Sequence, residues 1–154
     1  MNQVPTGDQL NILYIDDNKM DRKLVQHALE EDGGFVLKMA ASQHEFEQML
    51  LAGQFDLVLS DFNILGYQGL QVVEFVHRYQ PEIPVVIVTG TGSEEVAVEA
   101  MKLGAADYVI KSPNHIQRLP ITIRSVLEQR RLKREQELAQ EQLDQFFELS
   151  QDLM

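Results

Sequence analysis

The sequence predicts an α/β fold in which helices cover both faces of a parallel β-sheet. Short apolar runs rich in Val, Ile and Leu occur five times, and each is followed by an amphipathic pattern of helical period. Uninterrupted apolar runs are typical of strands buried on both faces, and strands that alternate with helices pair in parallel. The 154 residues are enough for one such domain with a modest extension.

The expected elements are delimited by residues that favour turns and helix starts. The strands are expected at residues 10–15, 35–41, 55–59, 84–88 and 108–110. Asn18 is placed to cap the first helix, and Ser42 with Glu45 has the spacing of a capping box for the second. The buried helix faces should include Met20, Leu24, Val25 and Ala28 in the first helix, and Val96, Ala100 and Leu103 in the fourth.

The C-terminal stretch is expected to form a long helix. Pro120 fits its first turn, and the residues from 128 onward lack Gly and Pro and are rich in Glu, Gln and Leu. We therefore divide the chain into a tail (1–8), a domain (9–130) and a helical linker (131–154). The linker either has a partly filled heptad-like face, which favours a homodimer, or is a solvated helix with charges on all sides. The residues of the heptad-like face are Leu132, Ala139, Leu143, Phe146 and Leu153.

Composition narrows the classes of partner. A net charge of −11 and a pI of about 4.7 disfavour a nucleic-acid backbone and favour a cation or a basic protein surface. The chain has no cysteine, which excludes disulfides and thiolate chemistry. No apolar run approaches the roughly 18 residues of a membrane span, and the first residues lack the pattern of a signal peptide. We expect a cytoplasmic protein that binds neither nucleic acid nor membranes.

Residues with charged or hydroxyl side chains follow the expected strands. Because the carboxyl ends of parallel strands share one edge of a sheet, these side chains should meet in one pocket. Three carboxylates, one hydroxyl and one ammonium group suit a divalent cation together with a phosphoryl group. The residues are Asp16, Asp17, Asp61, Thr89 and Lys111.

Four segments resemble the receiver domain of two-component response regulators. They are IDDN, LSDFNILGYQG, IVTGTG and GAADYVIKS, and the resemblance covers roughly Leu10 to Leu132. It implies a flavodoxin-like, doubly wound sheet with strand order 2-1-3-4-5. It also implies a signalling domain, not an enzyme with a separate substrate, that takes a phosphoryl group from a sensor histidine kinase or a histidine phosphotransfer protein.

The resemblance assigns Asp61 as the phosphoacceptor. It also implies a Mg²⁺ (or Mn²⁺) site formed by Asp16, Asp17 and Asp61, with the backbone carbonyl of Asn63 as a further ligand. In this site Asp17 is expected to be a more direct ligand than Asp16. The chemistry of the residues is consistent with this, because crowded carboxylates repel one another and a cation relieves the repulsion. Without the other segments, Asp17 could instead only cap the following helix.

The same resemblance assigns the residues that bind phosphate and switch the surface. Thr89 and Lys111 would bind phosphoryl oxygens, and movement of the Thr89 hydroxyl toward the phosphate would let Tyr108 turn inward. Each has a plainer interpretation. Thr89 could end a β-branched strand, Tyr108 could serve in packing with a solvated hydroxyl, and Lys111 could be a surface lysine.

The sequence departs from the family pattern in the loops that follow Asp61 and Lys111. The common Met-Pro after the phosphoacceptor is Ile64-Leu65, so the shape of that loop is open. The usual Lys-Pro is Lys111-Ser112-Pro113, so the sequence does not decide whether a cis peptide bond precedes Pro113.

Two alternatives to a phosphoacceptor come from other classes of protein. One is a docking or dimerisation module that no longer turns over phosphate. The other is a small Mg²⁺-dependent phosphatase, in which a second acid would stand at the position of Asn63. The segment FFELSQDLM also resembles the opening of a PAS domain, so we expect a larger regulator with a further domain.

Overall fold

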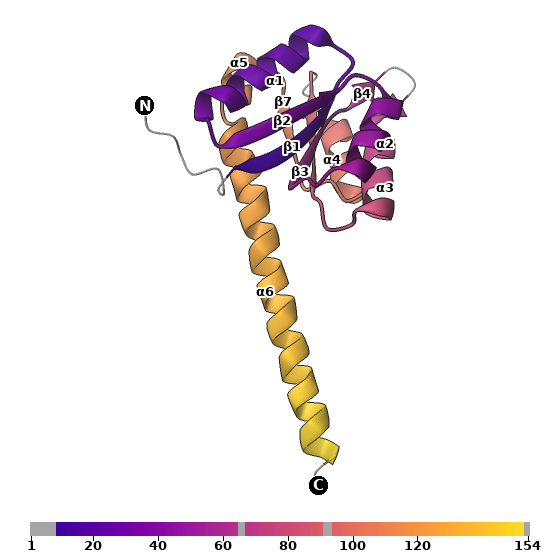
Figure 1. Cartoon of the computed structure of the whole chain (residues 1–154), viewed down its shortest axis with the longest axis vertical. Coiled ribbons are helices and arrows are strands. Elements are labelled where there is room, and N and C mark those ends of the chain that lie inside the picture. Colours follow the sequence, from indigo (N-terminus) through magenta and orange to yellow (C-terminus); the bar gives the residue numbers. More distant parts are fainter. Residues whose placement is uncertain (1–8, 65–66, 91–93, 153–154) are drawn as a thin grey trace.

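The computed structural model describes residues 9–64, 67–90 and 94–152, and these contain a five-stranded parallel sheet (Figure 1). Its strands are β1 (Leu10–Ile15), β2 (Phe35–Ala40), β3 (Leu57–Asp61), β6 (Val85–Thr89) and β7 (Asp107–Ile110). They lie in the spatial order β2-β1-β3-β6-β7, and each neighbouring pair is parallel. Among these five strands the order is 2-1-3-4-5, so the predicted flavodoxin-like arrangement is confirmed.

Helices alternate with the strands, as the sequence predicts. They are α1 (Lys19–Asp32), α2 (Gln43–Ala52), α3 (Gly69–Tyr79), α4 (Glu94–Lys102), α5 (Pro113–Ile116) and α6 (Leu119–Asp152). The predicted caps are present, because Asn18 accepts a hydrogen bond from the backbone N–H of Asp21 and Ser42 accepts one from that of Glu45. Where the sequence predicts only a loop after the third strand, the chain forms a short antiparallel pair of β4 (Asn63–Ile64) and β5 (Tyr67–Gln68).

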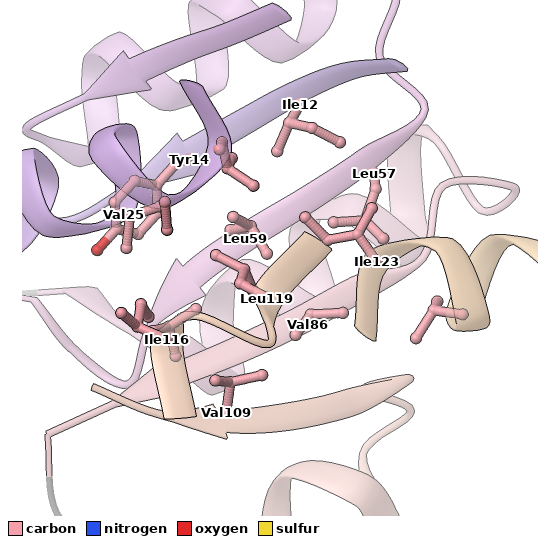
Figure 2. Close-up of a cluster of buried hydrophobic side chains, with 14 residues drawn as sticks. Ile12, Tyr14, Val25, Leu57, Leu59, Val86, Val109, Ile116, Leu119 and Ile123 are labelled. Carbon is pink, nitrogen blue, oxygen red and sulfur yellow. The ribbon is translucent and has the colours of Figure 1, made fainter. Parts of the chain in front are cut away.

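Different helices cover the two faces of the sheet. One buried cluster joins the sheet to α2, α3 and α4, and the other joins it to α1, α5 and the first turns of α6. Along β1, Leu13 belongs to the first cluster, whereas Ile12 and Tyr14 belong to the second, as the period of two in a strand requires. Figure 2 shows the second cluster, in which Leu119 and Ile123 of α6 lie against side chains of the central strands.

Two residues of the predicted helix faces are exposed instead of buried. Met20 is 73% exposed, because α1 contacts the sheet through its later turns around Val25. Leu103 is also exposed, because it lies beyond the last residue of α4. Ala100 is buried as predicted, and the side chain of Val96 lies outside the described residues.

Helix α6 has two parts in different environments. Its first turns pack on the sheet through Leu119 and Ile123, and Arg130 donates a 2.6 Å hydrogen bond to the carbonyl of Pro81. From residue 131 to residue 151 every side chain is exposed, and Figure 1 shows this part projecting away from the sheet. The long C-terminal helix is therefore confirmed. Neither α6 nor any other described helix has a stretch that is apolar enough to span a membrane.

Candidate functional site

The strand ends converge in the structure as the sequence predicts. Asp16 directly follows β1, Asp61 is the last residue of β3, and Lys111 directly follows β7. Thr89 ends β6, which lies between β3 and β7, and its carbonyl accepts a 2.7 Å hydrogen bond from the backbone N–H of Lys111. These residues therefore lie at one edge of the sheet, which we call the carboxyl edge, where ligands of open α/β sheets bind.

Lys111 lies at the centre of this site. Its Nζ is 2.6 Å from Asp16 Oδ2, 2.9 Å from Asp21 Oδ2 and 2.9 Å from Asp61 Oδ1. Only 4% of the Lys111 side chain is exposed. An ammonium group removed from water is stable only when it is paired and hydrogen-bonded. The three carboxylates meet that requirement and form a buried ion cluster around Lys111.

Asp16 is fixed by its own strand and by the start of α1. Its Oδ2 accepts a hydrogen bond from the hydroxyl of Tyr14, and its Oδ1 accepts a 2.9 Å hydrogen bond from the backbone N–H of Asn18. Its carbonyl accepts a 2.7 Å hydrogen bond from Nη1 of Arg22. Asp16 is completely buried. Both of its carboxylate oxygens therefore have hydrogen-bond partners within the protein.

An exposed carboxylate, that of Asp17, lies next to the ion cluster. One oxygen from each of Asp16, Asp17 and Asp61 lies within 4.8 Å of the others. Carboxylate oxygens in this arrangement fit a hard divalent cation, which takes oxygen ligands and keeps several waters when it is Mg²⁺. Both oxygens of Asp16 already accept hydrogen bonds, which is consistent with the prediction that Asp17 is a more direct ligand than Asp16. The role of the Asn63 carbonyl stays a prediction.

Burial and charge determine the protonation of the cluster. Burial raises the pKa of Asp61, and the neighbouring Lys111 opposes this without reversing it. Burial lowers the pKa of Lys111, but hydrogen bonds to Asp16, Asp21 and Asp61 outweigh that effect and raise it overall. Burial and the Asp16 carboxylate raise the pKa of Tyr14. Lys111 therefore stays charged and Tyr14 stays a hydrogen-bond donor.

The two predicted switch residues occupy different environments. Thr89 is buried at the end of β6, in the row of strand ends. Tyr108 is 39% exposed in β7, where it pairs with Ile87 of β6. The structure thus places one of them at the carboxyl edge and the other at the surface of the sheet's last strand. Their switching roles stay predictions.

After the β4–β5 pair, the backbone at Gly69 packs closely against the backbone of Asp61 and Phe62. The backbone N–H of Gly69 donates a 2.8 Å hydrogen bond to the carbonyl of Phe62. A Cβ atom on Gly69 would lie 2.9 Å from the carbonyl oxygen of Asp61 and 3.0 Å from Cα of Phe62. Only glycine fits this approach without displacing the backbone that positions Asp61.

The displaced proline after Lys111 begins a helix. Pro113 is the first residue of α5, a position that proline favours. Ser112 is the N-cap, and its Oγ accepts a hydrogen bond from the backbone N–H of His115. The Ser112–Pro113 peptide bond is trans. The shift of one residue therefore leaves Lys111 directly after β7, with its side chain in the cluster.

Two residues of the cluster, Tyr14 and Asp21, are not among those predicted from the sequence. Tyr14 lies within the first apolar run, where a tyrosine is expected to pack. Asp21 lies in the first turn of α1, where the helix dipole favours an acidic side chain. The signal that could have found Tyr14 is its spacing of two from Asp16, which places both on one face of the strand. For Asp21 the only signal is its position just after the strand that ends at the site.

These features define a doubly wound α/β domain with a buried Asp–Lys cluster at the carboxyl edge of its sheet. Residues 12–124 match the family model of the response regulator receiver domain. The chain belongs to this family, whose members are signalling domains of two-component systems.

Individual relatives are bacterial regulators. The transcriptional regulatory protein ZraR of Klebsiella oxytoca is 33% identical over 127 residues, which are 82% of this chain and 28% of that protein. A putative NtrX-like response regulator of Rickettsia felis is 34% identical over 129 residues, which are 82% of this chain and 27% of that protein. The chain therefore spans little more than a quarter of the length of these curated relatives.

Solved structures share the fold. The crystal structure of NtrX from Brucella abortus has 31% sequence identity and a TM-score of 0.74, over 82% of this chain and 28% of that one. The solution structure of the beryllofluoride-activated NtrC4 receiver domain dimer has 26% identity and a TM-score of 0.70, over 78% of this chain and 98% of that one. Fold and family thus agree with the resemblance carried by the four sequence segments.

Proposed function

We propose that this domain accepts a phosphoryl group on Asp61 from the phosphohistidine of a sensor histidine kinase or a histidine phosphotransfer protein. The observation that carries the proposal is the 2.9 Å contact between Lys111 Nζ and Asp61 Oδ1 inside a nearly buried cluster. The ammonium group fixes the acceptor carboxylate and supplies positive charge where phosphoryl oxygens would arrive.

Asp61 is the nucleophile in this proposal. One of its carboxylate oxygens forms the O–P bond while the N–P bond to the imidazole breaks, and the imidazole nitrogen keeps the electron pair. Catalysis then depends on position and charge alone, because no side chain has to supply a proton to Asp61. The domain acts on its own aspartate and later loses the phosphoryl group to water, so it is not an enzyme with a separate substrate.

The acidic cluster fits Mg²⁺ or Mn²⁺ as the cofactor. Asp17 and Asp61, with the backbone carbonyl of Asn63, would hold the ion, and Asp16 would support the site through its contact with Lys111. Support comes from the carboxylate oxygens of Asp16, Asp17 and Asp61, which lie within 4.8 Å of one another. When bound, the ion would neutralise negative charge on the transferring phosphoryl group.

Thr89 and Tyr108 would report the phosphorylation. The hydroxyl of Thr89 would donate a hydrogen bond to the aspartyl phosphate, and Tyr108 would turn from the surface toward the interior. The burial of Thr89 at the carboxyl edge and the partial exposure of Tyr108 support this assignment.

The signal would leave the domain through α6. We assign residues 131–154 as a helical linker in a larger cytoplasmic regulator, with a PAS-like domain next along the chain. The small share of the relatives' length that this chain spans supports a larger protein.

The exposed apolar side chains of the linker support pairing of α6 into a homodimer. They are Leu132, Leu138, Leu143, Phe146, Phe147 and Leu149. Light scattering should show a dimer that the double variant Leu143→Glu, Phe146→Glu converts to a monomer; equal masses would contradict the pairing.

Intact-mass spectrometry after incubation with acetyl phosphate tests the proposal. The wild type should gain one phosphoryl group in Mg²⁺ and none in EDTA, and Asp61→Asn should gain none. Asp144→Asn, which changes an exposed carboxylate of α6 in the same way, is the matched control and should behave as the wild type. Folded wild type without an adduct under any condition would contradict the proposal and would favour a docking or dimerisation module.

A further inference from the structure

Asp21 contacts Lys111, and the proposed phosphotransfer gives Asp21 no role. Asp21 lies in the first turn of α1, and its Oδ2 is 2.9 Å from Lys111 Nζ. An ammonium group has three N–H donors. Within the described part of the chain, three carboxylates surround that group, those of Asp16, Asp21 and Asp61. A phosphoryl oxygen that binds Lys111 must therefore displace one of these acceptors.

The three acceptors differ in how readily they can leave. Asp16 is completely buried and is fixed by Tyr14 and Asn18. Asp61 would itself carry the phosphoryl group. The Asp21 side chain is 34% exposed, so water can solvate its carboxylate when the contact with Lys111 breaks. Asp21 is therefore the acceptor whose release costs the least free energy.

We propose that Asp21 is a positioning residue that holds Lys111 in the unphosphorylated domain and is replaced there by a phosphoryl oxygen. This inference rests on the proposed phosphorylation of Asp61. Asp21 occupies a donor that the phosphoryl group needs, and its negative charge lies next to the position that this group would take. Both effects favour the unphosphorylated state, so Asp21 limits how fast and how fully the domain is phosphorylated.

Asp21→Asn removes the charge and keeps the size of the side chain. Acetyl phosphate is the phosphodonor, and Mg²⁺ is used at a concentration shown to be saturating for each variant. The phosphoryl adduct of Asp21→Asn should form about two to five times faster than that of the wild type, which is the range expected for loss of a partly exposed ion pair. Asp144→Asn makes the same change in net charge on the exposed part of α6 and should match the wild type. Asp21→Glu keeps the charge and should be slower than Asp21→Asn.

A second measurement does not involve phosphorylation. Hydrogen exchange of the Lys111 ammonium group with water, followed by NMR of ¹⁵N-lysine protein without phosphodonor, should be faster in Asp21→Asn than in the wild type, because one of its hydrogen bonds is lost. A purely structural effect on α1 would not change this exchange selectively at Lys111.

The outcomes separate this inference from the function on which it rests. Faster adduct formation and faster ammonium exchange in Asp21→Asn, with both unchanged in Asp144→Asn, would support it. An adduct that forms in the wild type at the same rate as in Asp21→Asn would overturn the inference and leave the proposed function intact. A wild type that forms no adduct would contradict the proposed function, and this inference with it.

Discussion

The two edges of the sheet both carry ion pairs, but in opposite environments. At the carboxyl edge, Lys111 is buried among carboxylates, with 4% of its side chain exposed. At the opposite edge, where the strands begin, Arg124 of α6 pairs with Asp32 at the end of α1 and lies 4.8 Å over the ring of Phe35. The Arg124 side chain is 46% exposed. The same kind of contact therefore lies in the interior at one edge and at the surface at the other.

The difference in burial distinguishes the edge that holds the candidate site from the edge at which α6 is attached to the domain. An exposed pair contributes about 0 to 1 kcal/mol, since water solvates both partners when it breaks. A buried cluster is strongly destabilised by loss of one member, because the remaining charges stay in a poorly solvated site. The start of α6 is thus attached by weak surface contacts together with buried apolar side chains, whereas the carboxyl edge concentrates charge where a phosphoryl group would arrive.

Removing the central cation should have the largest effect. Lys111→Met should lower the free energy of unfolding by about 3 kcal/mol at neutral pH, because buried carboxylates are left without their counter-charge. Chemical denaturation measures this, and added Mg²⁺ should restore part of the loss. A change below about 1 kcal/mol, the size of a surface pair, would contradict the distinction between the two edges.

The pH dependence of that loss follows from the raised pKa of Lys111. A group whose pKa is higher in the folded state contributes stability that is fully present below its unfolded pKa, about 10.4 for lysine. The contribution is lost as the pH rises through the higher folded value. The stability difference between wild type and Lys111→Met should therefore persist from neutral pH to about pH 10 and shrink above it. A difference that disappears between pH 7 and pH 9 would contradict this.

Tyr14→Phe tests whether a neutral donor also supports the carboxyl edge. Asp16 would lose a hydrogen bond to a charged acceptor, which should cost about 2 kcal/mol in denaturation experiments. Because the pKa of Tyr14 is raised in the folded state, its contribution is present below the ordinary tyrosine pKa of about 10 and is lost at higher pH. The variant should therefore approach the wild type in strong alkali. Equal stability of the two proteins at pH 7 would show that Tyr14 only packs.

Gly69→Ala perturbs the shape of the same edge without changing its charge. The added Cβ would lie 2.9 Å from the carbonyl oxygen of Asp61 and would force that backbone to move. Misplacement of the acceptor should slow adduct formation from acetyl phosphate by about tenfold. Gly90→Ala is a control, since a Cβ there would meet no atom of the described residues within 4 Å. Equal rates for Gly69→Ala and the wild type would mean that the backbone tolerates this contact.

The smallest effect is expected at the opposite edge. Arg124→Met keeps a long apolar side chain and removes the pair with Asp32. It should cost no more than about 1 kcal/mol, and it should leave the rate of adduct formation unchanged. A loss as large as that of Lys111→Met would remove the contrast between the two edges.

The sequence is sufficient to predict the residues that follow the strands. The alternation of apolar runs and helices defines a parallel sheet, and such a sheet brings Asp16, Asp61 and Lys111 to one edge whatever their separation in the chain. The long C-terminal helix follows in the same way from a stretch without Gly or Pro. These predictions depend on hydrophobic periodicity and on the alternation of strands and helices, and both can be recognised in short stretches of the sequence.

Partners within the site could not be predicted in the same way. The contact between Asp21 and Lys111 joins residues that are 90 positions apart, and it depends on where the first turn of α1 lies over the sheet. The buried hydroxyl of Tyr14 resembles an ordinary packed aromatic ring until its neighbour Asp16 is also known to be buried. Met20 has the spacing of a buried residue and is exposed, because periodicity does not show where along a helix the contact with the sheet begins.

Chemical trapping of the modified residue tests the central claim most directly. Borohydride reduces an acyl phosphate of aspartate to homoserine, so peptide mapping after incubation with acetyl phosphate and reduction identifies the acceptor. We expect homoserine at position 61, only in the presence of Mg²⁺, and none at Asp16 or Asp17. Homoserine at another carboxylate, or its absence from a folded protein that contains a phosphoryl adduct, would contradict the assignment of Asp61 as the phosphoacceptor.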